Sequence, residues 1–306
     1  MLQINGLATL PLNPNHHTRV GFYSFATYLE SEMLSGQADK SLLGINLVGS
    51  DDLTQQTQNA DILVGKINSL GIFNVETLID SDTREEVLAQ LLKLKLVGHI
   101  RDTKREILQC ACGKVYIPHG ARVFSIKNSN IKNGYSTCCN TILEVKNDLV
   151  LELRVLENSD ASQKISPYFV AEQFKKERDK FYYSGLVISR QKETLLMFQG
   201  YYIDNDIFWM LWLNTLRMRG MRISKLLSGV STIRQAAIAS VFVNETLKEI
   251  IFIPKINFLP HKDCDNLEKI VGRFGPDAVK KALLSKALSK RDVITLSGTE
   301  LPKHRS

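Results

Sequence analysis

Residues 6–30 read GLATLPLNPNHHTRVGFYSFATYLE, and the order of residue types in this stretch decides the fold. GLATLPL is a short apolar run that indicates a buried strand, and NPN is a turn signal that ends it. After the turn, large apolar side chains recur at the spacing of one helix face, namely Phe22, Phe25, Tyr28, Leu29 and Met33. A strand, a turn and a helix in this order predict the first βα unit of a parallel sheet.

The same rhythm continues along the chain. LLGINLVG at 42–49 predicts a second strand, and Ser50 or Asp51 is expected to cap a helix from Leu53 to about Leu70. A strand-like piece at 72–82 and an amphipathic helix at 83–96 follow. We therefore expect an α/β protein with a Rossmann-like (HUP-type) parallel sheet, whose ligands bind at the carboxyl ends of its strands.

The rhythm breaks at Asp102. Residues 102–156 are β-like, and ILEVKNDLVLELRV at 142–155 contains two alternating runs around an Asn-Asp pair, which predicts a hairpin. We expect a small β-rich insertion at 102–156 that divides the core into 1–101 and 157–262. LVISR at 186–190 predicts a strand of the second half, and residues 263–306 are expected to form two helices and a basic tail.

Four of the five cysteines form two close pairs, Cys110 with Cys112 and Cys138 with Cys139. A set of four thiolates is typical of a tetrahedral zinc site. Adjacent cysteine side chains diverge, so one member of the second pair is a possible bystander, with Tyr135 or His119 completing the shell. The other interpretation is buried thiols without metal. A closed thiolate shell leaves no position for water, so the zinc is expected to be structural and not catalytic.

Composition and charge limit the class of protein. An apolar fraction of 44% and a charged fraction of 23% are those of a soluble globular protein. The formal net charge is +7, and residues 271–306 hold eight Lys or Arg against three Asp or Glu. Such a basic end suits a polyanion such as RNA, and a solvated helix face is the alternative. The chain shows no secretory leader, and its most apolar segment, 207–213, is too short to span a bilayer. We expect a cytoplasmic protein without a membrane or DNA partner.

Several stretches, in this order, resemble the catalytic core of class I aminoacyl-tRNA synthetases, most closely the methionyl, cysteinyl and arginyl branch. LPLNPNHHTRVGFYSFATYLE has the shape of the family's first strand, HIGH signature and helix, and LVGSDD stands where the family has Gly-Thr-Asp-Glu. The cysteine module stands where several members carry a zinc-bearing connective peptide. GLVISR resembles the strand that re-enters the sheet, LLSGVSTIRQAAIASVF the ribose-binding element, and GRFGPDAVKKALL the helix after the KMSKS loop.

The resemblance implies that the protein activates an amino acid with ATP and Mg²⁺ as an aminoacyl-adenylate. The acyl group would then pass to a tRNA acceptor end or to another acceptor. By position in the motifs, the catalytic set includes His16, His17 and Arg19. FIPKINFLPHKD at 252–263 adds Lys255 and Lys262 as expected remnants of the family's lysines that clamp the pyrophosphate. The ATP-binding set is Pro14, Gly21, Gly229, Ser231 and Thr232, and the amino-acid-binding set is Asp51, Asp52 and Gln55.

The motifs also depart from the family pattern. Either RVGF or HHTR stands where HIGH should be: alignment on Gly21 places Arg19 and Phe22 at the histidine positions, and alignment on His17 loses the glycine. Ser231 replaces the ribose-binding acid, and KMSKS is missing from its proper place. We expect no anticodon-binding domain of the usual kind. The chain therefore resembles a truncated, free-standing paralogue with degenerate signatures. One alternative is a decayed protein that binds tRNA or a partner synthetase without turnover. Each residue also has a plainer interpretation: a solvated turn for the histidines, a helix cap for the acidic pair and ordinary surface lysines.

Overall fold

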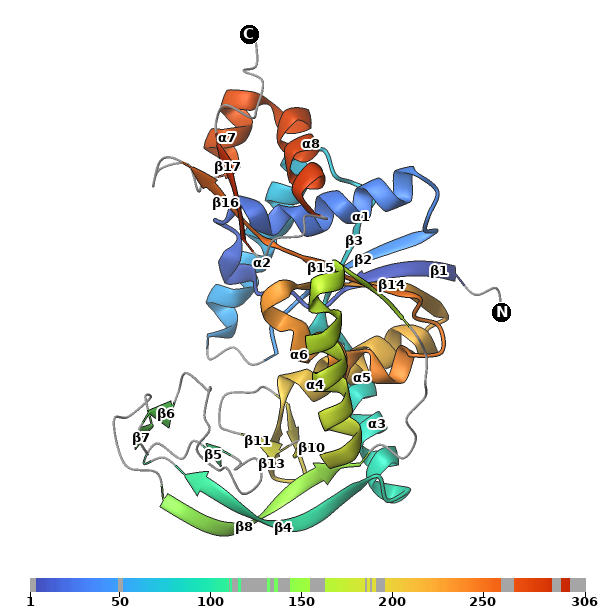
Figure 1. The fold of residues 1–306 in the computed structure, drawn as a ribbon, viewed down its shortest axis with the longest axis vertical. Coiled ribbons are helices and arrows are strands. Elements are labelled where there is room, and N and C mark those ends of the chain that lie inside the picture. The colour runs from blue at the N-terminus through green and yellow to red at the C-terminus, as the bar shows by residue number, and fades with distance from the viewer. Residues whose placement is uncertain are drawn as a thin grey trace.

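The computed structural model describes residues 4–48, 52–109, 111, 115–116, 131–132, 135–136, 144–154, 163–184, 186–187, 189–190, 196–259, 267–287 and 293–297. Its centre is a six-stranded sheet in the order β3-β2-β1-β14-β15-β9, in which every neighbouring pair is parallel (Figure 1). The strands are β1 (Ile4–Thr9), β2 (Lys40–Ile45), β3 (Glu76–Ile79), β9 (Lys164–Ser166), β14 (Met221–Gly229) and β15 (Glu249–Ile253). The expected Rossmann-like core is confirmed.

Helices cover both faces of this sheet. One face packs against α1 (Ser24–Leu34), α2 (Leu53–Ser69), α7 (Leu267–Phe274) and α8 (Pro276–Ala287), and the other against α3 (Arg84–Leu96), α4 (Ala171–Ser184), α5 (Asn205–Met218) and α6 (Ile233–Ala239). Figure 1 shows α1, α7 and α8 above the sheet and α5 and α6 below it. Because both faces are buried, successive residues such as Leu42 and Leu43 enter opposite cores, which explains the continuous apolar runs of the strands.

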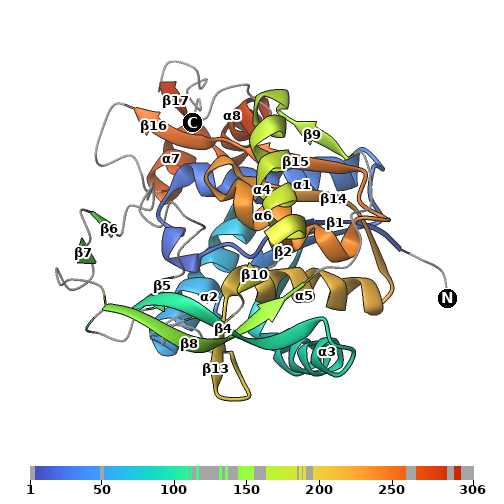
Figure 2. The same cartoon turned by 60° about the horizontal axis from the view of Figure 1, so that its bottom comes forward.

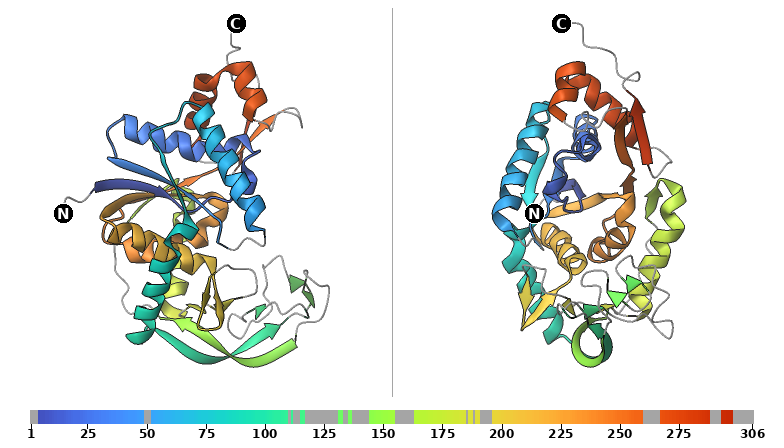
Figure 3. Two further views of the ribbon diagram at one scale, coloured as in Figure 1. Left: turned by 180° about the vertical axis from the view of Figure 1, so that it is seen from behind. Right: turned by 90° about the vertical axis from the view of Figure 1, so that its left-hand side faces the viewer.

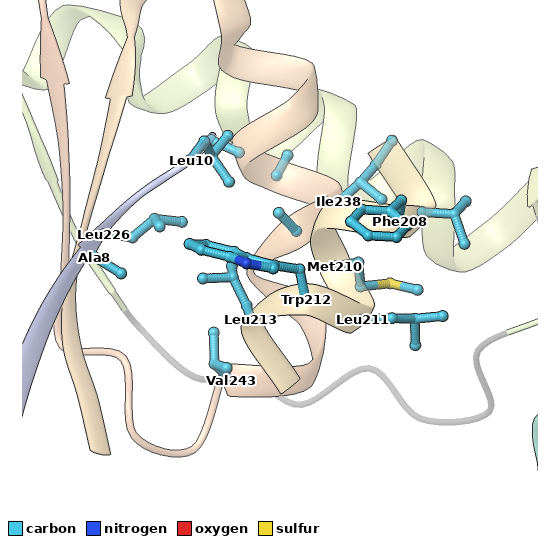
Figure 4. Packing of buried hydrophobic residues seen from close by; sticks show 14 of the residues in the cluster. Ala8, Leu10, Phe208, Met210, Leu211, Trp212, Leu213, Leu226, Ile238 and Val243 are labelled. Carbon is cyan, nitrogen blue, oxygen red and sulfur yellow. The ribbon is translucent and has the colours of Figure 1, made fainter. Parts of the chain in front are cut away.

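The core beneath β1 and β2 is built around Trp212 of α5. Its side chain has no exposed surface and lies beside Ala8, Leu213 and Leu226 (Figure 4). Gly44 of β2 makes room for the ring, since a Cβ at that position would lie 3.0 Å from the indole carbon Cη2. The middle of α5 is thereby held close under β1 and β2.

A long antiparallel ribbon leaves the sheet after α3. It consists of β4 (Ile100–Gln109) and β8 (Glu144–Leu153), which pair residue by residue along their whole length (Figure 2). The predicted hairpin at Asn147–Asp148 is therefore wrong, because these residues lie inside β8, opposite Glu106 and Arg105. An Asn-Asp pair without glycine is a weak turn former, and the pairing with β4 outweighs it. Figure 3 places this ribbon and the α7–α8 pair at opposite ends of the molecule.

A buried carboxylate holds the ribbon at its base. The side chain of Glu152 is only 1% exposed and accepts hydrogen bonds from Arg105 at 2.6 Å and from Arg154 at 2.8 Å. Burial raises the pKa of Glu152, but the two guanidinium groups outweigh it, and the net shift is downward. Its ionised form is thus the one that stabilises the ribbon.

Small strands surround the ribbon. They are β5 (Val115–Tyr116), β6 (Ile131–Lys132), β7 (Tyr135–Ser136), β10 (Leu186–Val187), β11 (Ser189–Arg190), β12 (Met197–Phe198) and β13 (Tyr201–Ile203). β10 pairs with β8 and β11 pairs with β13, so residues 186–190 do not enter the parallel sheet as expected. The edge position beside β15 is taken by β9, which comes before α4.

Two further differences concern element ends. The N-cap of α2 is Asp52, whose side chain accepts a hydrogen bond from the Gln55 N–H at 3.0 Å, and not Ser50 or Asp51. The C-terminal part is not purely helical, because β17 (Val293–Ser297) pairs in parallel with β16 (Lys255–Leu259). Pro276 occupies the first turn of α8, where its missing N–H costs no helical hydrogen bond. Short 3₁₀ turns complete the chain: η1 (Pro14–His16), η2 (Val20–Tyr23), η3 (Asp80–Thr83), η4 (Tyr168–Val170), η5 (Val230–Thr232) and η6 (Val241–Val243). Across the described ranges, every helix is too short or too polar to cross a membrane.

Candidate functional site

The sheet has one topological switch point, between β1 and β14. From β1 the chain moves outward through β2 to β3, and from β14 it moves the opposite way to β15. In open parallel sheets, ligands bind in the crevice at the carboxyl ends of the two strands at such a point. Here η1 and η2 follow β1, η5 follows β14, and β16 follows β15. These segments carry most of the predicted site residues.

Three of those residues come together at His16. Burial lowers the pKa of this histidine, and the positive charges of Arg19 and Lys255 lower it further. Arg19 immediately precedes η2 and Lys255 is the first residue of β16, so the two cations come from opposite halves of the sheet. A neutral imidazole beside two cations is an environment that favours an anionic ligand such as phosphate.

The fold holds η1 and η2 firmly in place. η1 begins at Pro14, which is buried, and the side chain of Asn13 caps it by accepting from the Asn15 N–H at 3.0 Å. The ring of His16 makes an edge contact with Phe22, with centroids 5.6 Å apart. The turn that carries His16 is therefore structured and partly covered by an aromatic ring, unlike a solvated turn.

His17 belongs to a second polar group, formed with α2 and α7. Its carbonyl accepts hydrogen bonds from the Tyr23 hydroxyl at 2.6 Å and from Lys66 Nζ at 3.5 Å, and Lys66 forms an ion pair with Glu268 at 3.2 Å. Burial and then the charge of Lys66 lower the pKa of His17. Its Nδ1 atom is buried without a hydrogen-bond partner, which leaves one polar atom of the ring available at this edge.

Amide side chains connect α2 to η1. Gln55 Nε2 donates to Asn59 Oδ1 at 3.2 Å, and Asn59 Nδ2 donates to Asn15 Oδ1 at 2.6 Å. Asp52 caps the same helix, so the plainer interpretation of this acidic residue is confirmed. The roles of Asp52 and Gln55 in amino-acid binding stay predictions. Their position at the start of α2 places them on the helix that supports the histidine turn.

Gly21 has a packing role that the sequence did not reveal. The backbone carbonyl of Ile256 occupies the space where a side chain on residue 21 would stand, and Ile256 Cβ would lie 2.8 Å from that Cβ. Only glycine allows β16 to lie this close to η2. The same packing keeps Lys255, the neighbour of Ile256, beside His16.

The predicted ribose-binding element forms a compact turn at the end of β14. Thr232 Oγ1 donates to the Gly229 carbonyl at 2.8 Å and accepts from the Gly229 N–H at 3.1 Å, while Ser231 is exposed. A Cβ at Gly229 would lie 4.0 Å from the Phe25 ring, so this turn lies against α1. The structure thus brings the β1 and β14 elements together across the switch point.

Sequence reasoning missed Asp80. This carboxylate directly follows β3, has no exposed surface, and accepts from Leu47 N at 2.7 Å, Val48 N at 3.1 Å and Trp209 Nε1 at 3.2 Å. Burial raises its pKa from 3.8 to about 6, against the opposing effect of these hydrogen bonds. The available signal was an aspartate at the carboxyl end of an apolar run in LIDSD.

The remaining predicted residues lie outside the described residues: Asp51, Lys262, Cys110, Cys112, Cys138 and Cys139. The first cysteine pair begins immediately after β4 and the second begins two residues after β7. Among the residues that the structure does describe, no group of three or more His, Cys, Asp or Glu is placed to hold a metal ion. The zinc site therefore stays a prediction.

Comparison with known proteins supports the fold. No family model and no curated protein matches the sequence. The solved structure of methionyl-tRNA synthetase from Mycobacterium tuberculosis in complex with methionyl-adenylate matches with a TM-score of 0.66 and 14% identity, over 97% of this chain and 67% of that one. A second structure of this synthetase, also bound by methionyl-adenylate, gives 0.63 and 13%, over 97% of this chain and 67% of that one. The apo form gives 0.65 and 14%, over 98% of this chain and 65% of that one.

These matches define the class of fold. The chain spans about two thirds of the length of the synthetases and aligns over nearly all of its own length. Its α/β fold is similar to that of these methionyl-tRNA synthetase structures, which agrees with the fold that the resemblance of the motifs implied. At this level of identity the likeness concerns architecture, and chemistry must be argued from the site itself.

Proposed function

We propose that this protein is an aminoacyl-tRNA synthetase-like ligase of the cytoplasm that activates an amino acid with ATP and Mg²⁺. The product would be an aminoacyl-adenylate, whose acyl group passes to a tRNA acceptor end or to another acceptor. The observation that carries the proposal is the convergence of Arg19 and Lys255 on His16 at the switch point of a synthetase-like sheet.

The chemistry requires positioning and charge neutralisation. A carboxylate oxygen of the amino acid attacks the α-phosphorus of ATP, the bond to the bridging oxygen of pyrophosphate breaks, and pyrophosphate leaves. Negative charge on the phosphates would be met by the guanidinium of Arg19 and the ammonium of Lys255. His16, neutral at pH 7 because its pKa is lowered, would donate one hydrogen bond to the phosphate. An acceptor hydroxyl then attacks the acyl carbon, and AMP leaves.

The paired cysteines have a supporting part in this proposal. Cys110 and Cys112, with Cys138 or Cys139 or both, would hold a structural zinc ion beside the β4–β8 ribbon. The support is their spacing and their position in the sequence, immediately after β4 and two residues after β7. The ion would stiffen the insertion, and no reaction step passes through it.

One observation favours the alternative of a binding protein without turnover. Ile256 fills the space above Gly21, a glycine that in the motif alignment belongs to the ATP-binding set. Ser231, which stands where the family has an acid, is exposed and offers only a hydroxyl. A decayed synthetase-like protein would bind tRNA in a salt-dependent manner and would not bind ATP.

ATP–pyrophosphate exchange, measured with each proteinogenic amino acid, tests the proposal. We expect exchange with one amino acid or a few related ones, and a fall of about tenfold or more in R19A and K255M, since each loses a charge-assisted contact. K93M is the matched control, because Lys93 is an exposed lysine of α3 on the other face of the sheet.

Absence of exchange with every amino acid, in zinc-replete protein, would overturn the ligase proposal. Calorimetry is a separate test of the binding protein. Salt-dependent tRNA binding without ATP binding supports it, whereas ATP binding that R19A and K255M weaken argues against it.

A further inference from the structure

Asp80 lies where the two halves of the core meet, at the carboxyl end of β3. Ile45 of β2 pairs with Ile79 of β3, so the chain segments that follow, beginning with Asn46 and Asp80, leave the sheet side by side. Asp80 then starts η3, which leads into α3. Its side chain is therefore placed between the exit of β2 and the N-terminal part of α5.

The two oxygens of this carboxylate contact different elements. Oδ1 accepts both backbone bonds, from Leu47 N at 2.7 Å and Val48 N at 3.1 Å. Oδ2 accepts the indole N–H of Trp209 at 3.2 Å. Leu47 and Val48 belong to the exit of β2, and Trp209 belongs to α5. One buried side chain thus fastens the segment that leads toward α2 to a helix of the second half.

We propose that Asp80, clamped by Trp209, is a positioning residue that fixes the exit of β2 and with it the N-terminal end of α2. This inference rests on the proposed function, because Asp52 and Gln55 at that end are the described residues of the predicted amino-acid site. α2 also supports the histidine turn through Asn59 and Asn15. Because that support comes from Asn59, farther along the helix, while Asp52 and Gln55 lie at its start, a shift of the first turn would disturb amino-acid binding more than ATP binding.

The chemistry of the contact explains why a carboxylate stands here. Three N–H donors point at one side chain, and an ionised carboxylate accepts on both oxygens and donates nothing. An asparagine could keep both backbone bonds through its Oδ1, but its Nδ2 would face the indole N–H. D80N therefore breaks the Trp209 contact alone, W209F removes the donor from the other side, and D80A removes all three bonds.

Amide hydrogen exchange tests the positioning role without any assay of activity. In D80A we expect the Leu47 and Val48 amides to exchange at least about tenfold faster, since each loses its bond to a buried charged acceptor. D80N should leave both amides protected. D82A is the matched control, because Asp82 is exposed in the same turn. Unchanged protection at Leu47 and Val48 in D80A would overturn the proposal.

Steady-state kinetics of ATP–pyrophosphate exchange test the link between Asp80 and amino-acid binding. D80N and W209F should each raise KM for the amino acid by about tenfold, with KM for ATP nearly unchanged, and the double variant should be no worse than either single one. Equal effects on both KM values, or additive effects in the double variant, would overturn the link. If the wild-type protein shows no ATP–pyrophosphate exchange, the ligase proposal and the link to the amino acid are both overturned. Amide hydrogen exchange would still decide the positioning role.

Discussion

The backbone carbonyl of Ile256 lies over Gly21, in the space that any side chain on residue 21 would need. This contact joins β16, which follows the second half of the sheet, to η2, which follows the first strand. It also sets the position of Lys255, because that residue precedes Ile256 in the same strand. The distance between the two halves of the proposed phosphate site therefore depends on the absence of a side chain at position 21.

Replacement of Gly21 by alanine should be costly. The added methyl group would meet backbone atoms of Ile256, which cannot move aside as a flexible side chain can, so β16 must shift. We expect G21A to lower the free energy of unfolding by about 2 kcal/mol or more, as overpacking of a filled core does, and to reduce pyrophosphate exchange. Urea denaturation followed by circular dichroism measures the first effect.

Gly65 provides the matched control for this substitution. It lies inside α2, and no atom outside its own helix and chain neighbours comes within 4 Å of a Cβ at that position. G65A should therefore stabilise the protein by up to about 1 kcal/mol, because alanine favours helix more than glycine does. A G21A variant as stable as the wild type would show that β16 does not press on η2.

The pH dependence of stability should reveal Asp80. Burial raises its pKa from 3.8 to about 6 in the folded state. Between about pH 4 and pH 6 the native state thus binds this proton when the unfolded state does not, so stability falls as the pH rises through the window. The loss amounts to about 3 kcal/mol, and it is complete above about pH 6.

The D80N variant isolates this contribution, since its amide does not titrate. The free energy of unfolding of the wild type minus that of D80N, measured by denaturant titration at each pH, should decrease by about 2 kcal/mol from pH 4 to pH 7. Other carboxylates, such as Glu152, cancel in this difference. A difference that does not vary with pH would show that Asp80 titrates normally.

The sequence predicted the parallel core because its strands are buried on both faces and read as apolar runs between amphipathic helices. It failed where the structure of a segment depends on the strand with which that segment pairs. Nothing local in Asn147–Asp148 reveals that β4 extends beside these residues, and nothing in LVISR reveals that β9 already occupies the edge of the sheet.

In the candidate site, too, local motifs were predictable and contacts between distant residues were not. The stretch of Pro14 to Gly21 was recognisable as a motif, and Lys255 was identified through the order of elements. Asp80 was not, because its importance comes from Leu47, Val48 and Trp209, which are distant in sequence. The packing role of Gly21 also depends on a strand that follows more than two hundred residues later.

The pKa values of His16 and His17 should respond to different cations. Burial is the largest cause of the low pKa of His16, followed by Arg19 and Lys255, so R19Q and K255Q should each raise it, R19Q more. The corresponding cation for His17 is Lys66, so K66Q should raise the pKa of His17 and leave that of His16 unchanged. Proton NMR titration of the imidazole signals, assigned with H16Q and H17Q, measures both. If R19Q leaves the pKa of His16 unchanged, Arg19 does not belong to the proposed phosphate site.

Zinc content tests the cysteine prediction. Purified protein should contain about one zinc ion per chain, and C110S and C112S should lose it, because a tetrahedral shell does not tolerate the loss of a thiolate. C264S is the control, since Cys264 stands apart from both pairs. If the side chains of Cys138 and Cys139 diverge, one of C138S and C139S keeps the metal and identifies the bystander. Zinc-free protein with four reduced thiols would favour the interpretation of buried thiols without metal.

A second experiment tests whether the predicted zinc ion has a structural role only. A structural ion beside the β4–β8 ribbon would stabilise the insertion, whereas the proposed phosphate site of His16, Arg19 and Lys255 contains no thiolate. Removal of zinc by a chelator should therefore increase amide hydrogen exchange in β4 and β8 and leave β1 and β14 protected. ATP binding, measured by calorimetry, should persist in the chelated protein. Simultaneous loss of ATP binding with β1 and β14 still protected would instead show that the metal takes part in the nucleotide site.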